Sequence, residues 1–308
     1  MNQIVAKYEK SEHSEEPHLT INIDGISLGK ILHSLYPDRD FLGLVPTLLD
    51  WLWDKEEREV VWTRLESEEK QIVPILMCPD DVDFWCTIIN VEVEKTEDTV
   101  KWLRIGVDES DFDNNPSKFI GTTVKWFNQV KPMEFERTQY ESFVSKFKTE
   151  IEKDEIKNRI RLWIDRISNQ NKIPLDIKAF NFGLIESEKG HQLYLIGTKK
   201  YDLLDDDWAC KEDFAPNEKY LNLETDSKKW NWDEIQPIVK SGIEQIIKTR
   251  TSPLTFVHKA EYLTTGFDNG TLLKIETKVC DDDVDKVIPT EVKNKKTSFW
   301  SKLKRVLK

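Results

Sequence analysis

The chain lacks the features that would place it in a membrane or assign it a catalytic reaction. No stretch of its 308 residues approaches the roughly 18 consecutive apolar residues that a membrane-spanning helix needs. The first residues show no basic segment followed by an apolar one, as a secretory signal would. The patterns G-x-G-x-x-G, G-x-x-x-x-G-K-[ST] and H-E-x-x-H are all missing, and we expect no G-x-S-x-G nucleophile elbow. We therefore expect a soluble cytoplasmic protein that holds no cofactor and is not an enzyme.

Cysteine and histidine are too few and too scattered to predict a metal site. The four cysteines, Cys78, Cys86, Cys210 and Cys280, include no C-x-x-C pair, and the five histidines stand singly. A structural zinc site needs four ligands at close spacing, so we expect no bound metal. Without a secretory signal, reduced thiols are favoured over disulfides. We expect Cys86, in an apolar run, to pack as a small hydrophobic side chain.

Acidic residues outnumber basic ones, and the imbalance is greater than the total suggests. The chain has 45 basic and 57 acidic side chains, a net charge of −12. Residues 293–308 contain seven basic side chains and no acidic one. Residues 1–292 therefore contain 38 basic and 57 acidic side chains, a net charge of −19. Such a body is repelled by nucleic acid and attracts a basic protein. We expect a basic protein partner and no nucleic acid, although acidic surface also serves solubility alone.

The length and the apolar content predict two folded domains. The 308 residues are 38% hydrophobic and include 11 tryptophans, enough for a substantial core. Domains usually hold roughly 100–200 residues each. We divide the chain into a polar N-terminal arm (1–18), a first domain (19–152), a second domain (153–290) and a basic amphipathic tail (291–308).

In the first half of the sequence, apolar and polar residues alternate as they do in the strands of a β-sheet. We expect a helix at 28–35, a helix start near Pro46, and strands at 19–23, 59–64, 72–77, 84–94 and 100–107. The connection between the last two strands is short and polar, so we predict that they pair antiparallel. A helical stretch follows from Thr138, where Thr138 and Glu141 fit a capping box, to Ser168. The apolar residues before and after the polar interval 152–155 do not fall on one continuous helix face. This change of phase predicts two helices with the domain boundary between them.

The second half repeats this mixture. We expect antiparallel strands at 177–185 and 192–196, a helix capped by Asn231 with Pro237 in its first turns, and a hairpin of 262–267 with 271–275. Both halves then have mostly antiparallel sheets with segregated helices. The predicted fold class is α+β, with two domains and a short basic amphipathic helix at the C-terminus.

Two acidic clusters are candidate sites. One contains Asp80, Asp81 and Asp83, and the other contains Asp205, Asp206, Asp207 and Trp208. Clustered carboxylates can bind a divalent cation, which would permit a metal-dependent hydrolase, or can simply form solvated turns. Neither cluster has the D-x-D-x-D-G spacing of a calcium loop. Since aromatic side chains anchor interfaces, Trp208 favours contact with a partner.

The tail has the pattern of a short interfacial helix. Apolar and basic side chains project to opposite sides, with Phe299, Trp300, Leu303 and Leu307 on one side and Lys302 and Arg305 on the other. Each basic residue contributes about 1 kcal/mol of attraction near an anionic membrane. The tail therefore predicts peripheral attachment to the inner membrane or contact with a partner. Docking onto its own acidic body, or disorder, is the alternative.

Two blocks of the sequence resemble a known class of proteins. The first runs from Pro74 through Cys86 to the segment 102–108, and the second from Phe180 through Ile185 to the segment 207–216. They are similar to bacterial proteins of the polymorphic-toxin immunity type, over about half the chain. The resemblance implies a non-enzymatic cytoplasmic binder that blocks a cognate toxin. Our hypothesis is such an inhibitor; the alternatives are a peripheral membrane protein and a metal-dependent hydrolase.

Overall fold

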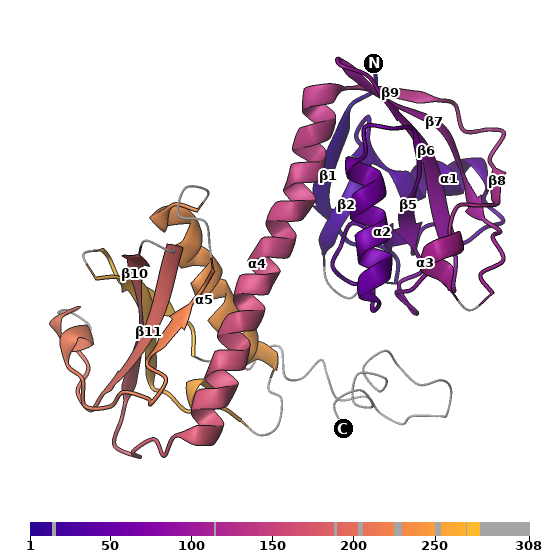
Figure 1. Cartoon of the computed structure of the whole chain (residues 1–308). Helices are drawn as coiled ribbons and strands as arrows, with labels where there is room; N and C mark the ends of the chain where they lie inside the picture. The colour runs from indigo at the N-terminus through magenta and orange to yellow at the C-terminus, as the bar shows by residue number, and fades with distance from the viewer. Residues whose placement is uncertain are drawn as a thin grey trace. The chain divides into compact units, whose positions relative to one another are not determined.

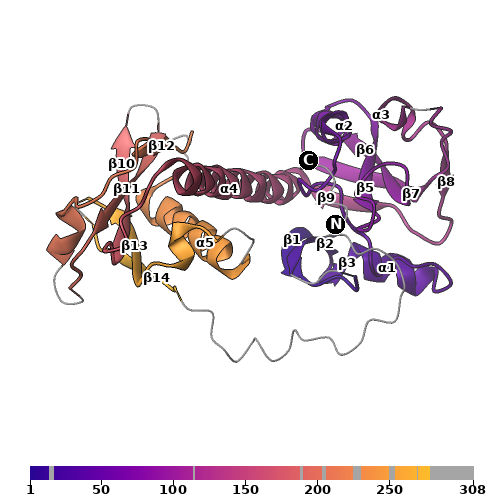
Figure 2. The same cartoon turned by 90° about the horizontal axis from the view of Figure 1, so that it is seen from below.

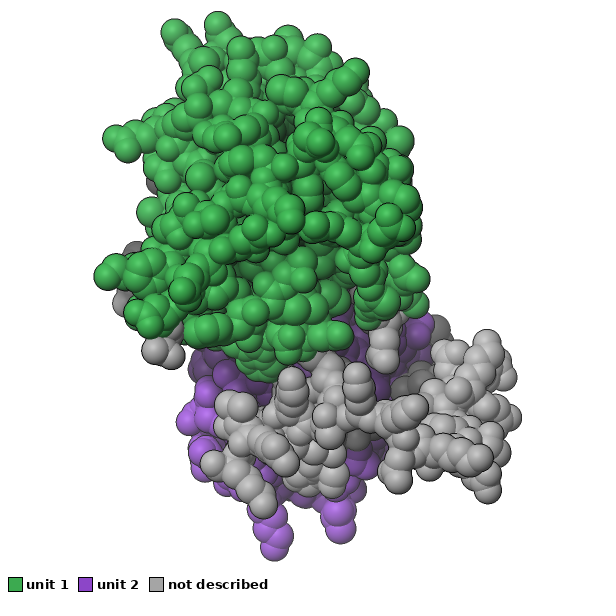
Figure 3. All heavy atoms as spheres, turned by 90° about the vertical axis from the view of Figure 1, so that its right-hand side faces the viewer, with its two compact units in different colours: residues 1–151, 297–308 green, residues 152–296 purple. Residues whose placement is uncertain are grey.

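The chain divides into two compact units, Met1–Ile151 and a second that begins at Glu152 (Figure 3). The computed structural model describes residues 1–13, 17–113, 115–187, 190–202, 206–224, 230–249, 254–268 and 270–277. The predicted tail and Asp205 lie outside these ranges. The described part is a mixed α/β protein whose sheets are mostly antiparallel, with five α-helices.

Unit 1 contains two antiparallel sheets (Figure 1). The smaller has the order β1-β2-β3, formed by Ile4–Glu9, His18–Ile23 and Ile26–Ser27. The larger has the order β4-β5-β6-β7-β8, formed by Val45–Pro46, Gln71–Met77, Ile88–Lys95, Thr99–Asp108 and Val124–Trp126, and β9 (Met133–Glu136) also pairs with β7. The helices are α1 (Leu28–Leu35), α2 (Lys55–Glu66), α3 (Pro116–Phe119) and the first part of α4 (Arg137–Gln170).

Aromatic side chains fill the core of unit 1. Trp102 on β7 is fully buried and meets Phe135 edge-on, with ring centroids 5.3 Å apart. Tyr140, Phe143 and Phe147 from α4 belong to the same core. The sheet and the start of α4 are therefore held together by burial of large rings, which dominate core energetics.

Unit 2 is one five-stranded sheet with the order β12-β11-β10-β13-β14. Its strands are Tyr220–Asn222, Gly190–Thr198, Ala179–Ser187, Tyr262–Phe267 and Leu273–Ile275 in that order, joined by 3₁₀ helices η1 (Asp206–Cys210) and η2 (Phe256–His258) and by α5 (Trp232–Thr249). Neighbours pair antiparallel except β10 and β13, which are parallel. A parallel pair needs a crossover connection, and α5 lies within it.

The alternation along β10 separates the two faces of this sheet. Phe180, Phe182 and Leu184 belong to the core that α4 and α5 cover (Figure 2). Asn181 and Ile185, at the alternate positions, line a cleft on the other face. Helices α4 and α5 therefore close one face, and the cleft lies on the other.

Several predictions are confirmed. The helix at 28–35 has the expected bounds. The antiparallel pairs β6–β7, β10–β11 and β13–β14 are present. Helix α5 begins right after Asn231 and contains Pro237 in its first turns. In each case a strong local pattern coincided with a clear turn or helix start.

Four predictions for the first half are wrong. The predicted arm contains β1, which pairs with β2 from Ile4 to Glu9. The predicted strand at 59–64 lies in α2, because Asp54 caps the helix by accepting from the Glu56 amide at 2.7 Å. Glu57, Val61 and Leu65 then share one buried face at helical spacing. Pro46 lies in β4 rather than near a helix start, and β6 begins at Ile88 rather than Phe84.

The two helices predicted between 138 and 168 are a single helix, α4. The polar interval 152–155 contains Glu, Lys and Asp but no glycine or proline, so nothing breaks the helix. The apolar stripe changes phase there because the first part of α4 packs into one core and the second part into another. The helix begins at Arg137, and Glu141 accepts from Arg137 Nε at 2.7 Å instead of closing a capping box with Thr138.

Candidate functional site

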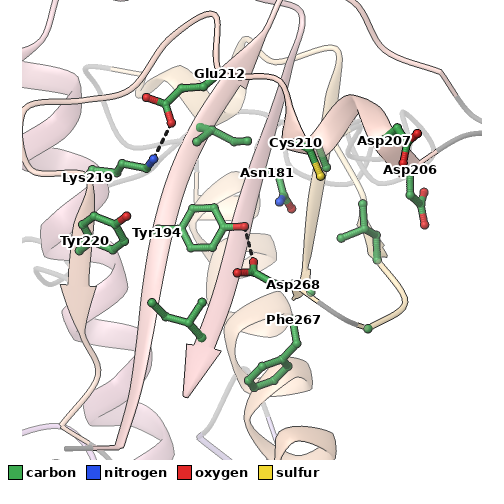
Figure 4. A pocket seen from close by; sticks show the side chains of 16 residues that line it. Asn181, Tyr194, Asp206, Asp207, Cys210, Glu212, Lys219, Tyr220, Phe267 and Asp268 are labelled. Carbon is green, nitrogen blue, oxygen red and sulfur yellow. Dashed lines mark hydrogen bonds and ion pairs between the residues drawn. The ribbon is translucent and has the colours of Figure 1, made fainter. Parts of the chain in front are cut away.

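A cleft of about 530 Å³ lies on the face of the unit 2 sheet opposite α4 and α5 (Figure 4). Its floor comes from β10, β11 and β13, and η1 forms part of its wall. Four of the described lining residues are acidic: Asp206, Asp207, Glu212 and Asp268. Lys219 is the one basic residue of the described lining. The volume falls within the roughly 300–1,000 Å³ typical of ligand sites.

The cleft exists because two neighbouring strands, β10 and β13, both have a glycine at paired positions in the sheet. Gly183 on β10 is the register partner of Tyr194 on β11 and of Gly266 on β13. A Cβ atom at Gly183 would lie 2.0 Å from the Tyr194 ring carbon Cζ. The missing side chains therefore let the Tyr194 ring lie across β10 and leave the floor open.

The Tyr194 hydroxyl is fixed as a hydrogen-bond donor. It donates to Asp268 Oδ1 at 2.5 Å (Figure 4). Burial and the adjacent Asp268 carboxylate raise the pKa of Tyr194 well above its usual value. The phenol thus remains neutral, so it serves as a polar wall rather than as a base.

Lys219 is occupied by partners within the protein. Its ammonium donates to the Glu212 carboxylate, which raises the pKa of Lys219. The same Nζ lies 5.8 Å from the centroid of the Tyr194 ring and 5.6 Å from that of the Tyr220 ring. The two rings can therefore face a cation, and the lysine charge is already balanced by Glu212.

The predicted cluster at 205–208 reaches this cleft in part. Asp206 and Asp207, both exposed, line it from η1. Trp208 differs from the expected surface anchor because it is only 4% exposed, with its ring centroid 5.0 Å from that of Tyr201. Trp208 therefore holds η1 onto the protein and leaves the carboxylates outside. Sequence reasoning missed Asp268 and Tyr194, which the strand register brings to the same place.

The second predicted cluster lies in unit 1, in the loop of residues 78–87 between β5 and β6. Asp83 Oδ1 accepts from the Trp85 amide at 3.0 Å, as expected of a turn carboxylate. Asp80 is exposed. Asp81 lies close to the sulfurs of Cys78 and Cys86, which the sequence spacing did not suggest. The two predicted clusters thus belong to separate units.

Glu57 is a buried acid that the sequence did not reveal. Its side chain is on α2, and its Oε2 accepts from the Phe84 amide at 3.2 Å. Burial above all, with the nearby charges of Asp83 and Asp54, raises the pKa of Glu57 to about 7. Two exposed rings lie at the loop of residues 78–87. Trp85 is part of the loop and is 56% exposed, and Trp53, whose amide donates to the Val82 carbonyl oxygen, is 49% exposed. The sequence does not distinguish Glu57 from the charged residues next to it, so its burial could not be predicted.

One further pattern has a catalytic precedent that the structure does not support. Residues 25–29 read G-I-S-L-G and so match the spacing of the hydrolase motif G-x-S-x-G, although we expected no such elbow in this chain. That motif requires a strained turn at the serine. Ser27 instead has φ −64° and ψ 142°, ordinary extended values, at the start of α1. It is a helix-start residue rather than a nucleophile elbow.

No protein family, curated protein or solved structure matches this chain. Among the described residues, no helix is long and apolar enough to cross a membrane. The tail residues proposed for membrane or partner contact, Phe299, Trp300, Lys302, Leu303, Arg305 and Leu307, lie outside the described ranges.

Proposed function

We propose that this protein is a non-enzymatic binder of the immunity type, which acts in the cytoplasm and receives a basic side chain of a partner protein in the unit 2 cleft. One observation carries the proposal. Asp206, Asp207 and Asp268 line the cleft, whereas its lysine is already paired with Glu212. The described lining thus has more acidic than basic side chains, and a lysine or arginine of the partner would reduce that difference in charge.

The aromatic walls support the same ligand. The Tyr194 and Tyr220 rings have centroids 6.2 Å apart, and both already face an ammonium group. A guanidinium or ammonium that enters beside them would gain cation–π attraction as well as charge-assisted hydrogen bonds. The −19 charge of residues 1–292 would speed the encounter with a basic partner and make it sensitive to salt.

The experiment is affinity capture with matched variants. The purified full chain is mixed with the products of neighbouring genes, and captured proteins are identified and their affinity measured at rising ionic strength. We compare Asp206→Asn/Asp207→Asn with Glu155→Gln/Glu261→Gln, which removes the same charge from exposed positions outside the cleft lining. The first variant should lose about tenfold or more in affinity, and the second should bind as the wild type does.

Two results would count against the proposal. Equal affinity of the Asp206→Asn/Asp207→Asn variant and the wild type would remove the cleft from the interaction. An affinity that does not fall as salt rises would remove its electrostatic basis. If the captured partner is a toxin, co-expression with the wild type should restore growth of the host cells, and co-expression with the Asp206→Asn/Asp207→Asn variant should not.

A further inference from the structure

The loop of residues 78–87 brings together side chains that are distant along the chain. Met77 and Ile88 are register partners at the end of the β5–β6 pair. The next residue, Cys78, donates its amide to the Thr87 carbonyl oxygen at 3.0 Å. The two arms of the loop therefore leave the sheet side by side, which places Cys78 next to Cys86.

A tight turn brings Asp81 to the same point. The Val82 amide donates to the Cys78 carbonyl oxygen at 3.3 Å, and Val82 has a φ of 46°. A β-branched residue rarely adopts this left-handed conformation, which persists where the surroundings impose it. The buried Val82 side chain and a hydrogen bond from the Trp53 amide to its carbonyl oxygen supply that constraint.

The result is a compact set of metal-ligating atoms. The sulfurs of Cys78 and Cys86 and a carboxylate oxygen of Asp81 all lie within 4.8 Å of one another. In a tetrahedral zinc site with Zn–S near 2.3 Å and Zn–O near 2.0 Å, ligand atoms are about 3.5–3.8 Å apart. The distances between these ligand atoms therefore need to change by no more than about 1.3 Å to reach this spacing.

We propose that Cys78, Asp81 and Cys86 bind one zinc ion and leave its fourth coordination position open. Two thiolates with one carboxylate favour zinc over magnesium or calcium, which prefer oxygen ligands alone. With three protein ligands, the fourth position is available to water or to a group from a bound molecule. The amides of Phe84 and Trp85 are tied to Glu57 and Asp83, so the segment between Asp81 and Cys86 is held in place.

The test uses Co²⁺ as a spectroscopic substitute for zinc in the reduced, metal-stripped full chain. We expect one Co²⁺ per chain, with thiolate-to-cobalt absorption that added Zn²⁺ abolishes. Cys78→Ser and Cys86→Ser should lose this absorption, and Asp81→Asn should weaken binding roughly tenfold or more. Two controls should match the wild type: Cys210→Ser, because Cys210 is an exposed thiol in the other unit, and Asp80→Asn, because Asp80 is the acidic neighbour of Asp81.

A second measurement needs no variant and so does not depend on how the variants fold. Alkylation of the wild-type chain, read by mass spectrometry, should show Zn²⁺ protecting Cys78 and Cys86 while Cys210 reacts at an unchanged rate. The proposal is overturned if thiolate-to-cobalt absorption is missing or survives both serine variants. Equal alkylation with and without Zn²⁺, or a Cys78–Cys86 disulfide formed under reducing conditions with zinc present, would overturn it as well.

Discussion

Replacing Glu57 with glutamine should stabilise the protein at alkaline pH and leave it nearly unchanged at acidic pH. Glu57 is 2% exposed, and burial raises its pKa from an ordinary value of 4.5 to about 7. At alkaline pH the folded protein therefore holds a buried carboxylate that unfolding would return to water. Glutamine is neutral, similar in size, and keeps an oxygen that can accept from the Phe84 amide.

The sign and the magnitude follow from proton linkage. Between pH 4.5 and about 7 the folded chain keeps a proton on Glu57 that the unfolded chain has released, so the free energy of unfolding falls as pH rises through this window. At about 1.36 kcal/mol per pKa unit, the whole effect is about 3 kcal/mol. Most of it, about 2.5 kcal/mol, lies between about pH 5 and about pH 8.

Urea denaturation of both proteins at these two pH values, with chelator and reductant present, measures the effect. Hydrogen exchange of the α2 amides, read by mass spectrometry, assigns it to unit 1. The matched control is Glu56→Gln, which removes the same charge from an exposed neighbour and should show little pH-dependent gain. A gain from Glu57→Gln that is equal at both pH values would refute the reasoning, because it could not come from ionisation.

Three further substitutions test the packing and the helix start. Gly183→Ala would place a methyl group in the Tyr194 ring and should destabilise the protein by about 1–3 kcal/mol, measured by chemical denaturation; an unchanged midpoint would contradict the tight contact. Trp208→Ala should cost about 3 kcal/mol or more and weaken partner capture, because the buried ring holds η1; full capture would show that η1 is held otherwise. Asp54→Ala should cost about 1 kcal/mol through loss of the α2 cap, seen as a lower denaturation midpoint than for Asp38→Ala, an exposed control.

Local pairs of elements could be predicted because their signals lie close together in the sequence. The β6–β7 hairpin combines alternation with a short polar connection, and the structure confirms it. The segment 59–64 was misread because its valines favour strands, whereas the deciding residue, Asp54, lies outside the segment. An N-terminal cap followed by acidic residues was the available signal.

The candidate sites were harder to predict because they depend on register across distant segments. Asp268 reaches the cleft only because β13 pairs in parallel with β10, and no local pattern announces that pairing. Likewise the sequence spacing of Cys78 and Cys86 matches no metal-binding motif, yet the register of Met77 with Ile88 brings the two cysteines together. Asp206 and Asp207 could be identified from sequence because clustered carboxylates beside a tryptophan are conspicuous, although the tryptophan proved to be buried.

The parallel pairing of β10 with β13 determines the order in which the strand pairs of unit 2 can form in the nascent chain. The β10–β11 hairpin closes over a two-residue gap between its strands, whereas Asn181 must meet Thr264 across 83 positions. Closing so long a segment has a high entropic cost, and contacts of this kind slow folding. During synthesis on the ribosome, one edge of β10 therefore stays unpaired until β13 has emerged. The cleft, which β13 helps to line, is completed only when β13 pairs with β10.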